Sequence, residues 1–236
     1  MKDFLNSLIN YPFKQLEKKV KQETGEEIYI PEIHAERFTI IPEVIRRCHF
    51  LTSTEKDVLY ELIAWASTTK NKQDGTCKVT ESHIRVNTNL GLSTVKKSIQ
   101  SLHKKGFISK ALDYDKSNIY RIKGVDKNPY VILSEWLFYI RDQRIQSFSN
   151  MMLENEQYNY ALSKKIFVEA TMNIIKNEDV YMKYIEKITV LLDTLYNPNL
   201  ECNYRHEIDS IFNDLNIEAH QLYLESANKL QDKFEN

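Results

Sequence analysis

Glycine and proline are scarce in this chain, which contains only 5 of each among its 236 residues. Both residue types are needed at the tight turns that connect the strands of β-sandwiches and barrels. A chain with so few of them favours long helices joined by few loops. Apolar residues make up 42% of the sequence, which is enough to bury a core. We therefore expect a mainly α protein.

Three short helices are predicted between residues 52 and 105. The first begins with a capping box, because Thr52 is followed three residues later by Glu55. In such a box each side chain accepts a hydrogen bond from a backbone amide that the helix leaves unpaired. Thr80 is expected to cap the second helix, "ESHIRVNTNL", and Gly91 is expected to end it.

The third helix leads into a predicted hairpin. Ser93 is expected to cap this helix, and Gly106 to end it, because glycine tolerates the left-handed backbone of a helix C-terminus. Residues 107–112 and 118–122 are predicted strands around the turn "DYDKS", and residues 76–79 are a possible short strand. The order helix, short strand, helix, tight turn, helix, hairpin is that of a winged helix-turn-helix, in which the hairpin is the wing.

The chain is expected to divide into three parts. Residues 1–37 form an N-terminal helical and extended arm, and residues 38–125 form the winged helix DNA-binding domain. Residues 130–236 form an all-α helical domain for dimerisation or partner docking. Within that last part, the string "YNPNLECN" at 196–203 is expected to interrupt the helices. The final segment, 204–234, is expected to form one or two helices, with "DLNI" at 214–217 between them if there are two.

Positive charge is concentrated in one short segment, although the net charge of the chain is only -1. Residues 82–112 contain 6 basic residues and no acidic residue, whereas residues 177–236 contain 5 basic and 12 acidic residues. An ordinary solvated face mixes both signs of charge. A basic segment within a helix-turn-helix pattern is instead typical of a surface that binds nucleic-acid phosphates. We expect the partner to be double-stranded DNA.

The predicted third helix separates apolar from polar side chains. Val95, Ile99 and Leu102 fall on one face and would pack inward. Serine, threonine and glutamine on the remaining surface can hydrogen-bond to base edges, and lysine neutralises phosphate. With two wing lysines and one arginine of the second helix, the candidate DNA-binding residues are Arg85, Ser93, Thr94, Lys96, Lys97, Gln100, Ser101, Lys104, Lys110 and Lys116.

Two strings of the sequence, "FTIIPEVIRRCHFLTSTEKDVLYELIAWAS" and "GTCKVTESHIRVNTNLGLSTVKKSIQSLHKKGFI", carry a family resemblance. Together they resemble the winged helix domain of bacterial plasmid and phage replication initiators and replisome organisers. The string "GLSTVKKSIQSLHKKGFI" is also similar to many bacterial transcription regulators. The resemblance covers Phe38 to Ile122 and implies a DNA-binding winged helix. By this resemblance the recognition-helix positions include Ser93, Thr94, Lys96 and Lys97.

Sequence motifs for catalysis are missing. The chain has no GxxxxGK[ST] phosphate loop, no HExxH and no GxSxG, and Cys48, Cys77 and Cys202 lack the spacing of a zinc site. We therefore expect a protein that is not an enzyme and has no catalytic residues, metal or cofactor. The first 22 residues lack the continuous apolar segment of a secretory signal, and no apolar stretch is long enough to span a membrane, so we expect a cytoplasmic protein.

These observations predict a sequence-specific, double-stranded DNA-binding protein that acts in replication initiation, or as a primosome-type protein, of a plasmid, phage or other mobile element. We expect it to form a homodimer through the C-terminal helices, because two recognition helices about one DNA turn apart bind more tightly than one. One alternative is a winged helix transcription regulator whose helical domain dimerises or senses a ligand. Another is a protein-interaction module whose winged helix does not contact DNA.

Overall fold

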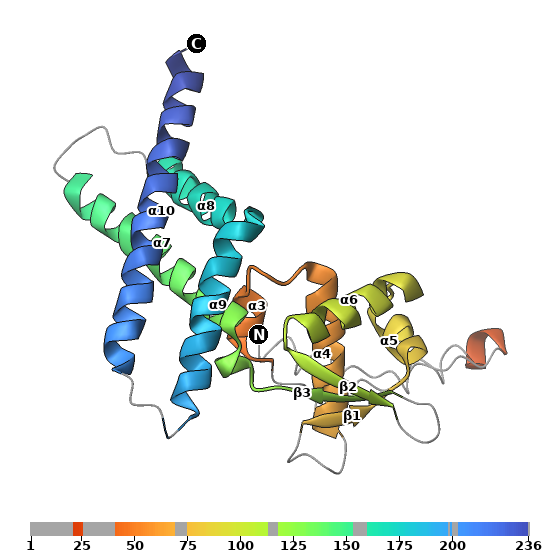
Figure 1. The fold of residues 1–236 in the computed structure, drawn as a ribbon. Helices are drawn as coiled ribbons and strands as arrows, with labels where there is room; N and C mark the ends of the chain where they lie inside the picture. Colours follow the sequence, from red (N-terminus) through yellow and green to blue (C-terminus); the bar gives the residue numbers. More distant parts are fainter. Residues whose placement is uncertain are drawn as a thin grey trace. The chain divides into compact units, whose positions relative to one another are not determined.

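The computed structural model forms two compact units, Met1–Ile40 and Ile41–Asn236 (Figure 1). In the first unit residues 21–24 are helical, and residues 1–20 and 26–37 of the predicted N-terminal arm lie outside the described residues. No helix in the described part of the chain is long and apolar enough to cross a membrane. The described residues are 21–25, 41–68, 75–112, 118–152, 160–197, 199 and 203–235.

The first half of the second unit combines short helices with a small sheet, and its strands pair antiparallel in the order β1-β3-β2. Both strands of the predicted hairpin are confirmed, and the possible strand near residue 77 forms the third. The helices are α3 (Glu43–Arg47), α4 (Ser53–Thr68), α5 (Glu81–Thr88) and α6 (Leu92–Lys104). The strands are β1 (Thr76–Lys78), β2 (Ile108–Leu112) and β3 (Asn118–Ile122).

The predicted caps of α4 and α5 are both confirmed. The backbone amide of Thr52 donates to Glu55 Oε2 at 2.7 Å, and the amide of Glu55 donates to Thr52 Oγ1 at 3.2 Å. At the start of α5, the amide of His83 donates to Thr80 Oγ1 at 3.3 Å. These bonds satisfy amides that have no partner within the helix, and they fix where each helix begins.

The turn between α5 and α6 differs from the prediction. Helix α5 ends at Thr88, and Asn89 adopts the left-handed backbone with a φ of 54°. Asparagine can replace glycine there because its short polar side chain is compatible with that conformation. The prediction that Gly91 ends α5 is therefore wrong, as is the prediction that Ser93 caps α6. Gly91 itself precedes α6, and Ser93 lies in the first helical turn.

Gly106 ends α6 as predicted, with a φ of 74°. Its amide donates to the carbonyl of His103 at 3.0 Å, and the amide of Phe107 donates to that of Leu102 at 2.9 Å. This pair of bonds is the Schellman arrangement, which needs a residue with positive φ at the position of Gly106. The arrangement directs the fully buried Phe107 into the core and leads the chain straight into β2.

The second half of the unit is helical, which confirms the expected mainly α class. A short 3-10 helix, η1 (Val125–Lys127), precedes it. The long helices are α7 (Pro129–Met152), α8 (Tyr160–Lys176), α9 (Glu178–Leu195) and α10 (Tyr204–Glu235).

The predicted break at 196–203 separates α9 from α10. Of the one or two helices expected after it, the structure has one, because α10 is continuous through 214–217. Leu215 is fully buried between Ile211 and Ala219, so a continuous helix keeps these apolar side chains in one line.

One hydrophobic core extends through both halves of the second unit. The ring of Phe50, just before α4, lies 5.9 Å from that of Tyr130 in α7 and 5.2 Å from that of Tyr181 in α9. The backbone amide of His49 also donates to Ser134 Oγ in α7 at 3.0 Å. The short helices and the long helices are therefore packed together rather than joined only by a linker.

Candidate nucleic-acid interface

Helix α6 has one apolar and one polar face. Val95, Ile99 and Leu102 are at most 3% exposed and pack inward, as predicted. The side chains on the opposite side of the helix are exposed and carry three positive charges and no negative charge. We call this surface the α6 face, and it consists of Ser93, Lys96, Lys97, Gln100 and Lys104.

Two further candidate residues of α6 lie at its edge. Thr94 and Ser101 are half-buried. Ser101 hydrogen-bonds to the carboxylate of Glu55, a buried residue of α4. Burial raises the pKa of Glu55, but hydrogen bonds from Ser101, from the amide of Thr52 and from Lys105 together hold it below the ordinary value. The hydroxyl of Ser101 therefore supports the contact between α6 and α4.

Lys105 follows α6 and is half-buried against α4 rather than exposed on the α6 face. Its Nζ lies 2.9 and 3.0 Å from the two carboxylate oxygens of Glu55 and donates to the carbonyl of Phe50 at 2.7 Å. Asn128 in turn donates to the carbonyl of Lys105 at 2.9 Å. Of the two adjacent lysines at the end of the helix, only Lys104 remains on the surface.

Glu81 connects α6 with the hairpin, and sequence reasoning missed it. Its carboxylate lies 3.2 Å from Lys110 Nζ on β2 and 4.0 Å from Lys96 Nζ on α6. Asn118 of β3 also donates to it at 3.5 Å. Glu81 directly precedes the acid-free segment in the sequence, and its position in the first turn of α5 directs it between the two lysines.

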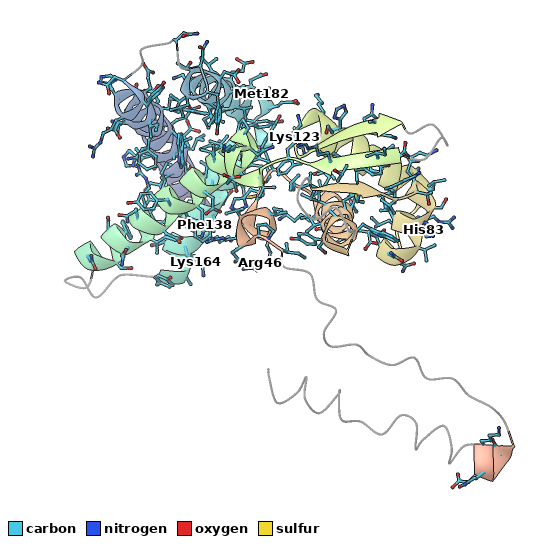
Figure 2. The ribbon with its side chains drawn as sticks, turned by 90° about the horizontal axis from the view of Figure 1, so that it is seen from below. Arg46, His83, Lys123, Phe138, Lys164 and Met182 are labelled. Carbon is cyan, nitrogen blue, oxygen red and sulfur yellow. The ribbon has the colours of Figure 1, made fainter. Side chains whose placement is uncertain are left out.

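The other candidate residues are more scattered. Arg85 is exposed on α5, the helix that carries His83 at the outer edge of this half (Figure 2). Lys116 lies outside the described residues. Within the described ranges, no acidic side chain forms an ion pair with Lys97 or Lys104. The structure thus brings together α6 and β2, with Lys97 and Lys104 as the lysines most available to an anionic partner.

Removing the charge of Glu81 tests this electrostatic arrangement. We expect Glu81→Gln to strengthen the binding of duplex DNA about fivefold, because Lys96 and Lys110 lose an internal anion that competes with phosphate. The slope of log affinity against log salt should steepen by about 1. Fluorescence anisotropy with a labelled duplex measures both quantities. Glu186→Gln, at an exposed position of α9, is the matched control and should leave the affinity and the salt slope unchanged. Weaker binding by the Glu81 variant would contradict the view that Glu81 competes with phosphate for Lys96 and Lys110.

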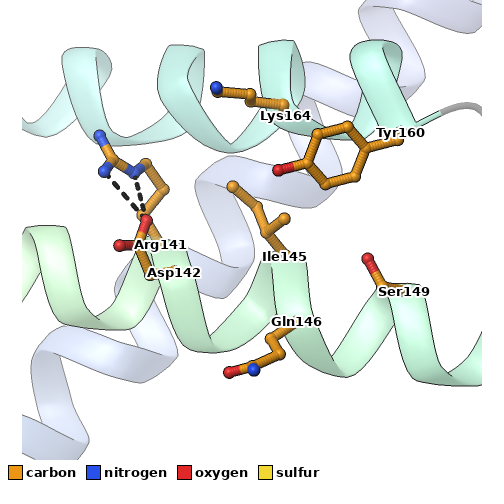
Figure 3. A pocket seen from close by; sticks show the side chains of 7 residues that line it. All are labelled: Arg141, Asp142, Ile145, Gln146, Ser149, Tyr160 and Lys164. Carbon is orange, nitrogen blue, oxygen red and sulfur yellow. Dashed lines mark hydrogen bonds and ion pairs between the residues drawn. The ribbon is translucent and has the colours of Figure 1, made fainter.

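Among the described residues, two hollows outside the α6 face can be defined. The larger has a volume of about 550 Å³ and lies between α7 and α8. On its α7 side, Arg141 donates hydrogen bonds of 3.0 and 2.9 Å to the carboxylate of Asp142, and Lys164 of α8 lines the opposite side (Figure 3). The smaller, of about 250 Å³, is lined by Phe50, Tyr130 and other residues at the junction of the two halves. In the described part of the chain, no three His, Cys, Asp or Glu side chains converge to hold a metal ion.

Comparison with known proteins adds no assignment. No protein-family model, curated protein or solved structure matches this chain.

Proposed function

We propose that residues 41–122 form a winged helix that binds double-stranded DNA through the α6 face. The observation that carries this proposal is the separation of side chains on α6. The exposed side has three lysines with serine and glutamine and no acidic residue, while the apolar side chains are buried. The order α4-β1-α5-α6-β2-β3, with a sheet of order β1-β3-β2, supports the winged helix assignment.

In this proposal α6 is the recognition helix and enters the major groove, which is about 12 Å wide and admits one helix. Lys96, Lys97 and Lys104 neutralise phosphates, so that affinity falls steeply with salt. Ser93 precedes these lysines in the first turn of α6, Gln100 lies between them, and both can hydrogen-bond to base edges. The hairpin β2–β3 is the wing, and Lys110 extends the positive surface from α6 onto it.

The start of α6 supports a phosphate contact. Gly91 precedes the helix and provides no side chain to cap it. The first backbone amides of a helix have no partner within the helix and attract an anion. Ser93 in that turn offers a hydroxyl beside these amides. A DNA phosphate at this end of α6 would orient the helix in the groove, which is the usual role of backbone contacts.

We propose replication initiation for a plasmid, phage or other mobile element as the process, on the basis of the sequence resemblance. The experiment is a selection of bound fragments from the genomic and plasmid DNA of the source organism at physiological salt. The double variant Lys96→Glu, Lys97→Glu is the control. We expect a few enriched sites that the control loses, clustered at a replication origin.

Other outcomes of the selection would change the proposal. Enriched sites that overlap promoters would favour the transcription regulator. If no fragment is enriched and the double variant behaves like the natural protein, the DNA-binding proposal is wrong. The α6 face would then belong to a protein-interaction module.

A further inference from the structure

The outer face of α10 is free of charge over most of its length. Six exposed side chains follow one another at intervals of three or four residues, so they form a single line about 27 Å long. Ile217 and Leu224 are 61% and 47% exposed at its centre. We call this line the α10 stripe, and it consists of Ser210, Asn213, Ile217, Gln221, Leu224 and Asn228.

The opposite face of the same helix is fully occupied. Leu215 is completely buried, Ser226 is 3% exposed, and α10 packs against α8 and α9 along this side. Figure 1 shows α10 crossing α7 and extending past α8 at its C-terminal end. The α10 stripe therefore faces away from the bundle to which its helix belongs.

A charge-free outer face is unusual in this part of the chain. Residues 177–236 contain 12 acidic residues, and an outer helix face that contacts only water is normally rich in lysine and glutamate. The charged residues of α10 lie instead on its sides. Asp214, for example, binds Lys187 of α9 at 2.6 Å, and Glu218 accepts a hydrogen bond from Tyr184 at 2.5 Å. Depletion of charge around exposed aliphatic side chains is typical of the core of a protein interface.

We propose that the α10 stripe is the interface of a homodimer, in which α10 packs antiparallel against α10 of a second copy. The part of the stripe from Asn213 to Asn228 is self-complementary about a point between residues 220 and 221. A two-fold axis there sets Ile217 against the Leu224 position of the other copy, and Asn213 against its Asn228 position. Each apolar side chain then meets an apolar side chain, and the outer amides Asn213 and Asn228 meet each other, while Gln221 lies next to the axis, as a two-fold interface allows.

The antiparallel direction follows from charge. The N-terminal half of α10 holds Glu207, Asp209, Asp214 and Glu218, with one basic residue, Arg205. A parallel pair would bring two such acidic halves and two like helix-dipole ends together. The antiparallel pair instead sets each acidic half against a less acidic C-terminal half, in which Lys229 and Lys233 offset two of the three acidic residues Glu225, Asp232 and Glu235. This dimer does not depend on DNA binding, although two α6 faces in one particle would raise the affinity for DNA.

The test uses two variants of the full chain, Ile217→Lys and Leu224→Glu, without DNA. Sedimentation velocity should give twice 27.9 kDa for the natural chain and 27.9 kDa for each variant alone. Each variant should raise the dimer dissociation constant about 100-fold or more, because it places a charge at the centre of the interface. Val190→Lys, at a 65% exposed position of α9, is the control and should remain dimeric.

An equimolar mixture of the two variants distinguishes the direction of pairing. In the antiparallel dimer the introduced lysine faces the introduced glutamate, while the other contact keeps its natural leucine and isoleucine. The mixture should therefore return to the dimer mass, whereas a parallel pair would not be restored. A natural chain that is monomeric at micromolar concentration, or variants that remain dimeric with unchanged circular dichroism, would overturn the proposal. A mixture that stays monomeric would overturn the antiparallel register.

Discussion

Replacing Lys96 and Lys97 together by glutamate is expected to weaken the binding of duplex DNA at least about 100-fold at physiological salt. The double substitution reverses two of the three positive charges on the α6 face. Lys97 has no ion-pair partner in the described part of the chain, and the only partner there of Lys96 is Glu81 at 4.0 Å. The slope of log affinity against log salt should fall by about 2, as anisotropy titrations at several salt concentrations will measure.

The chain offers a matched control for this experiment. Lys164 and Lys165 are also adjacent and exposed, but they lie on α8 in the helical half (Figure 2). Lys164→Glu with Lys165→Glu makes the same change in net charge and should leave DNA affinity nearly unchanged. Equal losses in the two double variants would mean that only the overall charge matters. Full binding by the Lys96, Lys97 variant would mean that the α6 face is not the contact surface.

The second large effect concerns stability. Glu55→Ala is expected to lower the free energy of unfolding by about 3 kcal/mol, because it removes one partner of a buried ion pair. The carboxylate of Glu55 caps α4, accepts a hydrogen bond from Ser101 of α6 and pairs with Lys105. In the alanine variant the ammonium group of Lys105 keeps only its hydrogen bond to the carbonyl of Phe50. Urea unfolding followed by circular dichroism gives the difference between the variant and the natural chain.

The effect of Glu55→Ala should depend on pH. The pKa of Glu55 is held below its ordinary value of 4.5 in the folded protein. A carboxyl group with a lowered folded-state pKa contributes stability that is present above its unfolded-state pKa and is lost as pH falls through its folded-state pKa. The variant should therefore differ most from the natural chain at neutral pH and approach it in acid.

Glu43 provides the control for the stability experiment. Its carboxylate pairs with Arg46 on the surface of α3, where both side chains are more than half exposed. Water screens such a pair, so Glu43→Ala should leave the free energy of unfolding nearly unchanged. If the two alanine variants have equal stability, or if the loss in the Glu55 variant is the same at acid and neutral pH, the account of the Glu55 network is wrong.

Helix caps and helix ends that depend only on neighbouring residues could be predicted from the sequence. The Thr52–Glu55 capping box, the Thr80 cap and the left-handed Gly106 each depend on bonds within five residues, and all three are found as predicted. The inward positions on α6 also follow from helical spacing alone. The exposed α6 face is therefore the part of the candidate site that the sequence defines best.

Contacts between distant segments could not be read in the same way. Lys105 looks like one more lysine of a basic helix, yet its carboxylate partner Glu55 lies 50 residues away. Glu81 lies just outside the acid-free segment in the sequence, but folding brings it between α6 and β2. Likewise, "DLNI" has the composition of a turn, but burial of Leu215 outweighs that local preference and keeps α10 continuous.

The most direct test of the central claim, that the α6 face contacts DNA, is site-specific photocrosslinking. A photoreactive residue replaces Gln100, in the middle of the α6 face, or Lys164 on α8 as the control. Each protein is irradiated with a duplex bearing an enriched site at physiological salt. The account predicts that the protein labelled at position 100 crosslinks to DNA and that the protein labelled at position 164 does not. Crosslinking from position 164 alone, or from neither position while the duplex is bound, would contradict it.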